Sequence, residues 1–166
     1  MPPKGTKKPS PWSMYPNLHD QVADKLEEVQ LDYSFFEHDN DHGTIQTYDT
    51  NIMGRFTCHN QKCSTKGWSS KVIAVTIRTY SRDRYNVRVY HQRCKRCDRL
   101  GRPTIDEKSY IDRVVYRIKK WNGVDVEIPF FSEKKTQPHE MDFCEGCKAG
   151  HCLRGKMNGS VDYLFD

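Results

Sequence analysis

Five cysteine and histidine side chains gather in the segment 138–152, which reads PHEMDFCEGCKAGHC: His139, Cys144, Cys147, His151 and Cys152. Thiolates and imidazoles are the ligands that Zn²⁺ prefers, and a Cys-x-x-Cys spacing lets one short turn place two sulfurs on the same ion. The segment therefore offers a complete set of four ligands in His139, Cys144, Cys147 and Cys152. His151 is the alternative imidazole, but it adjoins Cys152, and neighbouring side chains rarely reach one metal.

The other four of the seven cysteines form two pairs upstream: Cys58 with Cys63, and Cys94 with Cys97. Seven cysteines and one histidine make eight ligands, which two tetrahedral zinc sites use completely. The sequence therefore predicts two structural zinc ions. The predicted ligands are Cys58, Cys63, Cys94 and Cys97 in the first site and His139, Cys144, Cys147 and Cys152 in the second. His91, three residues before Cys94, is the alternative imidazole for the first site, although that site is already full.

Two closed metal sites argue against catalysis. A catalytic zinc keeps three protein ligands and an open position for water, and neither predicted site leaves such a position. No cysteine remains to act as a free nucleophile, and the sequence contains no glycine-rich phosphate loop. We expect a protein that is not an enzyme, with no catalytic residues and no small-molecule substrate.

The first site needs an element that brings its two cysteine pairs together. Residues 71–79 place Ile73, Val75 and Ile77 on one side of a strand, and residues 84–91 alternate more cleanly. With the turn 81–83 between them, this pattern predicts a β-hairpin. One cysteine pair precedes this hairpin and the other follows it directly. Because an antiparallel hairpin brings its ends together, the four sulfurs converge on one ion, as in a zinc ribbon.

Helical spacing of apolar residues predicts one helix over 18–30, with Asn17 as its N-cap, and a second over 109–121 that ends at Gly123. Residues 32–39 and 127–131 are expected to be short extended segments. The fold class is therefore α+β: a zinc-stabilised, ribbon-like antiparallel hairpin or sheet with two helices and two structural zinc sites.

The assembled motifs resemble the 3CxxC-type zinc-binding domain. The resemblance covers about residues 53–152 and rests on GRFTC, GWSSKVIAVTIR, VYHQRCKRC and PHEMDFCEGCKAGHC. It includes the Trp68-Ser69-Ser70 motif that follows the first cysteine pair, although that pair is spaced Cys-x4-Cys here instead of Cys-x2-Cys. The chain looks most similar to small single-domain fungal members, and more distantly to receptor-transporting and zygote-arrest-type proteins. The resemblance implies zinc binding, while the roles of the relatives range from chaperoning membrane receptors to binding RNA.

We expect three parts along the chain: a disordered basic arm over 1–16, the 3CxxC-type zinc-binding domain over 17–152 with its cysteine-rich core at 53–152, and a tail over 153–166. The start MPPKGTKKPSPW is basic and rich in proline, without the apolar stretch of a signal peptide. No apolar run is long enough for a transmembrane helix. These features predict a cytoplasmic protein, with the nucleus as the alternative.

Charge is unevenly spread along the chain. Residues 20–41 contain eight acids and one lysine, whereas residues 78–102 contain nine bases and two acids. Such a split indicates either that the two regions face each other or that a basic face is free for an acidic partner.

Three functions are compatible with these features. The first is binding of RNA or a ribonucleoprotein, the ribosome included, because cationic side chains neutralise phosphate and the interleaved tyrosines stack on bases. The residues expected to contact RNA are Arg78, Arg82, Arg84, Arg88, Arg93, Lys95, Arg96 and Arg99. The second function is a protein adaptor or cochaperone, as in receptor-transporting proteins. The third is a DNA-binding regulator, which the absence of a recognition-helix finger pattern disfavours.

Overall fold

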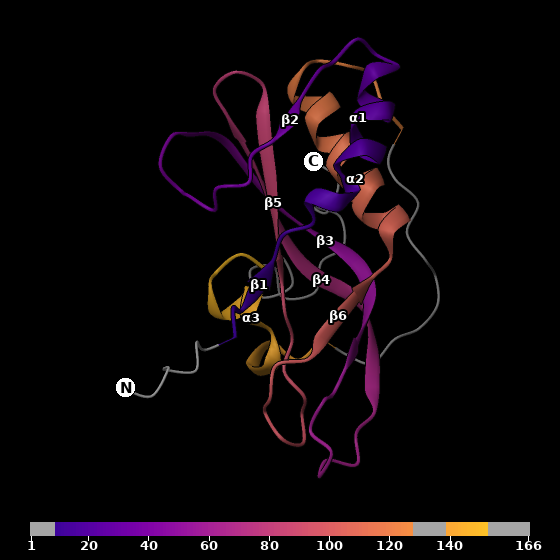
Figure 1. Cartoon of the computed structure of the whole chain (residues 1–166), viewed down its shortest axis with the longest axis vertical. Helices are drawn as coiled ribbons and strands as arrows, with labels where there is room; N and C mark the ends of the chain where they lie inside the picture. The colour runs from indigo at the N-terminus through magenta and orange to yellow at the C-terminus, as the bar shows by residue number, and fades with distance from the viewer. Residues whose placement is uncertain (1–8, 128–138, 153–166) are drawn as a thin grey trace, which may run out of the picture.

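The centre of the fold is an antiparallel meander of three strands, whose side chains alternate between the two faces of the sheet (Figure 1). The computed structural model describes residues 9–127 and 139–152. Within them the sheet has the order β1-β5-β4-β3-β6, and β2 lies parallel to β5. The strands are β1 (Trp12–Ser13), β2 (Ser34–Phe35), β3 (Thr44–Thr57), β4 (Gly67–Tyr80), β5 (Arg84–Tyr90) and β6 (Arg102–Ile105). The predicted antiparallel zinc-ribbon-like sheet is therefore confirmed.

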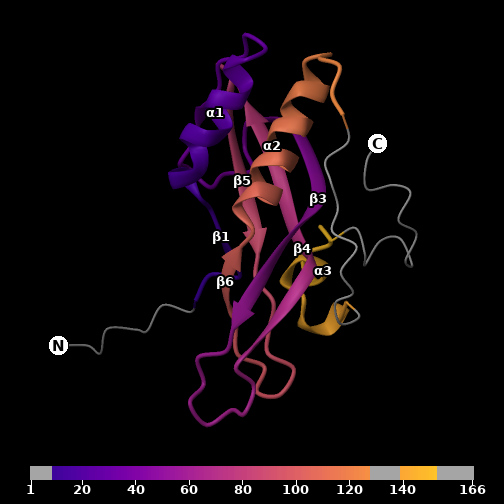
Figure 2. The same ribbon diagram turned by 90° about the vertical axis from the view of Figure 1, so that its right-hand side faces the viewer.

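The two faces of this sheet carry different layers (Figures 1 and 2). Val75 of β4 and Val87 of β5 belong to the main core, in which they pack with residues of α1 and α2. Ala74 and Tyr90 point to the opposite face, where they cluster with two of the cysteines. The helical elements are η1 (Pro16–Leu18), α1 (His19–Glu27), α2 (Glu107–Trp121), η2 (Met141–Phe143) and α3 (Glu145–Lys148). Because successive side chains of a strand alternate in direction, the same strands contribute residues to both clusters, one on each face of the sheet.

The predicted helices form, but their starts differ from the prediction. The second helix begins at Glu107 because Asp106 caps it, accepting a hydrogen bond from the backbone N–H of Ser109 at 3.0 Å. It stops before Gly123, whose φ of +72° is the left-handed conformation that ends helices. The first helix is shorter than predicted, and Leu18 occupies its N-cap position without a side-chain bond. Asn17 is therefore not the cap, because a 3₁₀ turn starting at Pro16 leads into the helix.

The predicted disordered arm is wrong for its last residues. Trp12 and Ser13 pair with Tyr90 and Val89 at the edge of the sheet. The ring of Trp12 meets Tyr90 edge-on at 5.9 Å between centroids, and the guanidinium of Arg88 lies over it at 4.4 Å. One aromatic side chain thus anchors the segment, a long-range contact that composition does not reveal. Residues 1–8, the tail over 153–166 and most of the predicted extended segment over 127–131 lie outside the described residues.

The acidic and basic regions face each other at the top of the sheet. Arg78 is 1% exposed, and its guanidinium contacts Asp39 at 2.7 Å and Asp41 at 2.8 Å. The side chain of Arg88 reaches the same oxygen of Asp39 at 2.7 Å. Asn86 accepts a further bond from Arg78 and donates to backbone carbonyls of the acidic loop. The first of the two expected arrangements of charge is therefore present, since these arginines hold residues 36–41 against the sheet.

Replacing Asp39 by alanine is expected to destabilise the fold by about 2 kcal/mol, because it leaves the buried Arg78 short of a partner. This is below the roughly 3–5 kcal/mol typical of breaking a buried pair, since Asp39 is partly exposed and Asp41 remains. Urea unfolding measures the change, and Glu37→Ala at an exposed acid of the same loop is the control. If both substitutions lower the stability equally, the ion pair of Asp39 with Arg78 does not stabilise the fold as argued.

The stability lost on replacing Asp39 should also depend on pH. Burial alone would raise the pKa of Asp39, but hydrogen bonds from Arg78, Arg88 and Trp12 hold it below its ordinary value of 3.8. The ionised carboxylate therefore contributes stability above pH 3.8, and that contribution disappears as the pH falls through the lower pKa of the folded state. The difference between wild type and Asp39→Ala should narrow below pH 3.8.

Candidate metal centres

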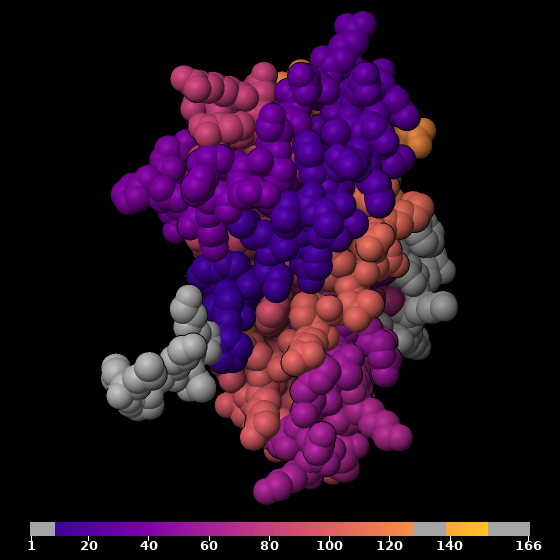
Figure 3. Space-filling view, in the orientation of Figure 1, coloured from indigo at the N-terminus to yellow at the C-terminus, as the bar shows by residue number. Residues whose placement is uncertain are grey.

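Two turns at the lower end of the sheet carry the first set of cysteines. Cys58 and Cys63 lie in the loop between β3 and β4, and Cys94 and Cys97 lie in the turn after β5. Each turn is closed by its own backbone: the N–H of Cys63 donates to Asn60 at 2.9 Å, and the N–H of Cys94 donates to the carbonyl of Arg99 at 2.9 Å. Figure 3 shows the two segments packed side by side at this end of the molecule.

The sulfur atoms of the first set fit a tetrahedral zinc ion. Sγ of Cys58 lies 3.7 Å from Sγ of Cys97, and Sγ of Cys63 lies 3.8 Å from that of Cys94. All four ligand atoms lie within 4.8 Å of one another. Zinc–sulfur bonds of about 2.3 Å at tetrahedral angles require sulfurs about 3.8 Å apart. The predicted ligand set of the first site is therefore brought together with the spacing that zinc requires.

The second set is built around the short helix α3. Cys144 precedes this helix, and its sulfur accepts a hydrogen bond from the backbone N–H of Cys147 at 3.4 Å. Gly150, with φ at +77°, turns the chain back so that Cys152 returns to the cluster. Nε2 of His139 lies 3.3 Å from Sγ of Cys147 and 3.5 Å from Sγ of Cys152. A zinc ion with one nitrogen and three sulfur ligands requires a separation of about 3.5 Å.

The two alternative histidines are held elsewhere. His151 stacks on Tyr90 with 14° between the ring planes, and its Nδ1 lies 3.0 Å from a carboxylate oxygen of Asp49. His91 is hydrogen-bonded through Nε2 to the hydroxyl of Ser13 at 2.7 Å, and burial lowers its pKa. His139 is therefore the imidazole ligand of the second site, as predicted.

The electrostatics of the first set suit a cation. Burial raises the pKa of Cys94, but hydrogen bonds from the backbone N–H groups of Cys97 and Arg96 outweigh it and lower the pKa to about 6. The backbone N–H of Asn60 lowers the pKa of Cys58, yet burial and three neighbouring sulfurs raise it overall, to about 11. Four crowded sulfurs cannot all ionise without a positive charge among them, and a divalent ion supplies it. In the second set the hydrogen bond with Cys152 and burial raise the pKa of Cys144 well above its ordinary value.

The two sites are joined through the residues between Tyr90 and Cys94. The backbone N–H of Arg93 donates to the carbonyl of Phe143 at 2.7 Å, and the N–H of Glu145 donates to the carbonyl of His91 at 3.1 Å. The side chains of Arg93 and Glu145 add an ion pair at 2.6 Å. The second site is therefore fixed to the strand that leads into the first.

The Trp-Ser-Ser motif ties β4 to the same segment. The indole N–H of Trp68 donates to Oε1 of Gln92 at 2.9 Å, and Ser70 Oγ accepts from Nε2 of Gln92 at 3.1 Å. Trp68 also stacks on Phe56 at 5.4 Å with 17° between the planes. Sequence reasoning singled out Trp68 as a motif but missed Gln92, for which only its position two residues before Cys94 was a signal.

The predicted RNA-contacting residues divide into two groups. Arg78 and Arg88 are held by Asp39 and Asp41, so they face the covered side of the sheet. Arg93 is held by Glu145. Burial and ion pairing thus remove Arg78 from any accessible surface, which corrects the expectation that Arg78 contacts RNA.

The second group of basic side chains is accessible. Arg82 and Arg99 are exposed, and Arg84 lies over the ring of Phe36 at 4.3 Å. Lys95 is about half exposed beside Glu140, and the exposed Arg96 donates to the hydroxyl of Ser64. Further exposed bases surround the first zinc site; they are Arg55, Lys62, Lys66 and Arg102.

Fold and sites together define a small α+β domain organised by two structural zinc sites of four ligands each. A model of the 3CxxC-type zinc-ribbon family, described as a zinc-binding domain, matches residues 51–150, which is more than half of the chain. The protein therefore belongs to this zinc-binding family. No curated protein and no solved structure matched the chain. No helix of the described residues is long and apolar enough to cross a membrane.

Proposed function

We propose that this domain is a non-catalytic module that binds RNA, alone or within a ribonucleoprotein, through the surface around its first zinc site. The observation that carries the proposal is the charge of that end of the molecule. Arg55, Lys62, Lys66, Lys95, Arg96, Arg99 and Arg102 are all exposed there. The sequence has no acid between Asp49 and Asp83 and one acid, Asp98, between residues 84 and 105. Clustered cations on a rigid support attract phosphate and release its counterions.

The shape of this surface favours RNA over duplex DNA. The surface is made of two zinc-closed turns and the ends of strands, while α1 and α2 lie toward the other end of the sheet (Figure 2). Neither α1 nor α2 is therefore presented at the basic end for a major groove, and α3, which lies nearer, has only four residues. Single-stranded RNA is bound instead by cationic surfaces combined with aromatic side chains. Action in the cytoplasm or nucleus, and the absence of catalysis, belong to the same proposal.

Charge reversal at three exposed arginines tests the proposal. We expect Arg96→Glu, Arg99→Glu and Arg102→Glu together to abolish binding to a single-stranded RNA at 0.1 M salt or above. Substitution of the same three arginines by neutral glutamine should flatten the slope of log K against log salt by about 2, since each lost contact removes roughly 0.7. Fluorescence anisotropy with single-stranded RNA, duplex RNA and duplex DNA across a salt series gives both quantities.

The matched control reverses three exposed lysines on the helices, Lys25, Lys108 and Lys120, with the same change in net charge. This variant should keep at least half of the binding free energy, and both variants should retain two zinc ions per chain. Equal loss in the two triple variants would mean that only net charge matters. Undiminished RNA binding by the first variant would refute the proposed surface, and the protein adaptor or cochaperone would become the leading alternative.

A further inference from the structure

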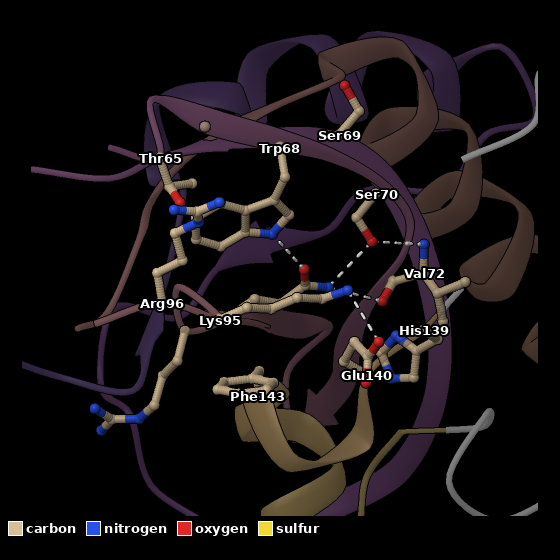
Figure 4. Close-up of a pocket in the computed structure, with 13 residues that line it drawn as sticks. Thr65, Trp68, Ser69, Ser70, Val72, Lys95, Arg96, His139, Glu140 and Phe143 are labelled. Atoms are coloured by element: carbon tan, nitrogen blue, oxygen red, sulfur yellow. Dashed lines mark hydrogen bonds and ion pairs between the residues drawn. The ribbon is translucent and has the colours of Figure 1, made fainter. Parts of the chain in front are cut away.

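A cavity of about 220 Å³ lies between the two zinc sites (Figure 4). Its walls come from the start of β4, from the segment after β5 and from the residues that begin the second site, among them Trp68, Ser70, Gln92, Lys95, Arg96 and Phe143. The volume is below the roughly 300–1,000 Å³ typical of drug-sized ligands. The cavity therefore suits one small ring system, not an extended chain.

One wall of this cavity is a rigid aromatic surface. Trp68 is covered on one face by Phe56, and its indole N–H is fixed by Gln92. Phe143 projects toward the cavity from η2, a different segment (Figure 4). The ring of Trp68 does not have to be ordered when a ligand enters, because Phe56 and Gln92 already hold it, and backbone hydrogen bonds fix the segment that carries Phe143. Preformed aromatic surfaces of this kind stack on planar ligands at low entropic cost.

The same cavity offers a hydrogen-bond donor and an acceptor. Ser70 Oγ accepts from the backbone N–H of Val72 and from Gln92, both at 3.1 Å. Both lone pairs of the hydroxyl are then used, so its hydrogen is left for a ligand. Oε1 of Gln92, a residue only 8% exposed, accepts one bond from Trp68 and keeps a second lone pair. The edges of nucleobases carry donors and acceptors side by side.

The charged side chains at the rim of the cavity determine where the phosphate of a bound nucleotide would lie. Arg96 is exposed and belongs to both the cavity and the basic surface around the first zinc site. Lys95 lies 2.9 Å from Glu140 on the opposite side, and both are nearly half exposed. A phosphate is repelled by Glu140 and attracted by Arg96, so it lies toward the first zinc site.

We propose that this cavity holds one unpaired base of a bound RNA, stacked on Trp68 and Phe143, with its phosphate at Arg96. This proposal rests on the RNA binding proposed above and adds base-dependent affinity to it. Because the walls come from both metal sites, the base pocket is complete only when both sites are formed.

The experiment compares eight-nucleotide single-stranded RNAs with an otherwise identical oligomer in which every position is abasic. Wild type should bind the best homopolymer about five- to a hundredfold more tightly than the abasic oligomer, the usual effect of stacking one base. Phe143→Ala should reduce this ratio to about one and leave the salt slope unchanged. Leu100→Ala, outside the cavity lining, is the matched control and should keep the ratio.

A second measurement does not depend on a variant that folds. Photocrosslinking of wild type to an oligomer containing 4-thiouridine, followed by mass spectrometry, should place the crosslink on Trp68, Phe143 or their immediate neighbours. Wild type that binds RNA in a salt-dependent way but without a base-dependent ratio would overturn the pocket alone. Absence of any RNA binding would overturn both proposals, and crosslinks confined to the other end of the sheet would overturn the pocket and the surface.

Discussion

Stripping the metal with a strong chelator is expected to unfold this domain. Structural zinc sites in small peptides contribute about 10–16 kcal/mol at pH 7, which is comparable to the whole stability of most domains, about 5–15 kcal/mol. The first site closes the ends of β3 and β4, and the second covers Ala74 and Tyr90 on the face opposite the helices. Without zinc, the crowded thiolates repel, and one end and one face of the sheet lose their cover.

Three measurements test this prediction. The purified protein should contain two zinc ions per chain by metal analysis. Chelation should abolish the near-ultraviolet signal, to which Trp12 contributes because it packs on the second site, and Trp68 because it lines the cavity between the two sites. All seven cysteines should then react with a thiol reagent. One zinc or fewer per folded chain, or a native signal with every thiol reactive, would contradict the prediction and show that the helix-covered core folds alone.

The ligands could be predicted from sequence because their chemistry is discrete. Seven cysteines and one histidine fill two tetrahedra with none left over, and spacing alone separated His139 from His151. The hairpin was equally clear, because strand alternation continues on both sides of a polar turn. At these positions the local sequence pattern agrees with the long-range geometry, so the ligands and the hairpin could be predicted from the pattern alone.

The arginines of the hairpin show where sequence reasoning fails. Alternation tells which residues share a face, but it does not tell whether that face is covered. Arg78 and Arg88 were expected to contact RNA, which requires that their face of the hairpin be accessible. Both faces are in fact covered, because the acidic residues of 36–41 and the ring of Trp12 lie against these two arginines. Strand β6 and helix α3 were missed for a related reason, since elements of four residues carry too little periodicity.

Gly146 in α3 gives the sharpest contrast between local and tertiary effects. A Cβ atom added there would lie 2.4 Å from the Cβ of Ala74 on β4, and 3.5 Å from Cys144 Sγ. By helix propensity alone, Gly146→Ala should stabilise the protein by about 1 kcal/mol. We expect the opposite, a loss of about 3 kcal/mol at the upper end of overpacking costs, because a strand and a zinc-bound turn leave neither carbon free to move.

The second zinc site should weaken with this substitution while the first stays intact. Competition with a chromogenic chelator should show one zinc released at lower chelator concentration than in wild type. Gly43→Ala is the matched control: its added carbon meets nothing within 4 Å, and its φ of +78° gives only the strain of a left-handed residue. It should leave both zinc affinities unchanged.

The decisive variant is the double substitution Gly146→Ala with Ala74→Gly, which moves the methyl group from the strand to the helix. Removing the opposing Cβ relieves the clash, so most of the lost stability and zinc affinity should return, less about 0.5–1 kcal/mol for a glycine within a strand. Contacting residues are expected to couple in this way. If the two effects simply add, the close approach of α3 to β4 does not hold the second zinc site, and its stability must come from the hydrogen bonds of Arg93 and Glu145 instead.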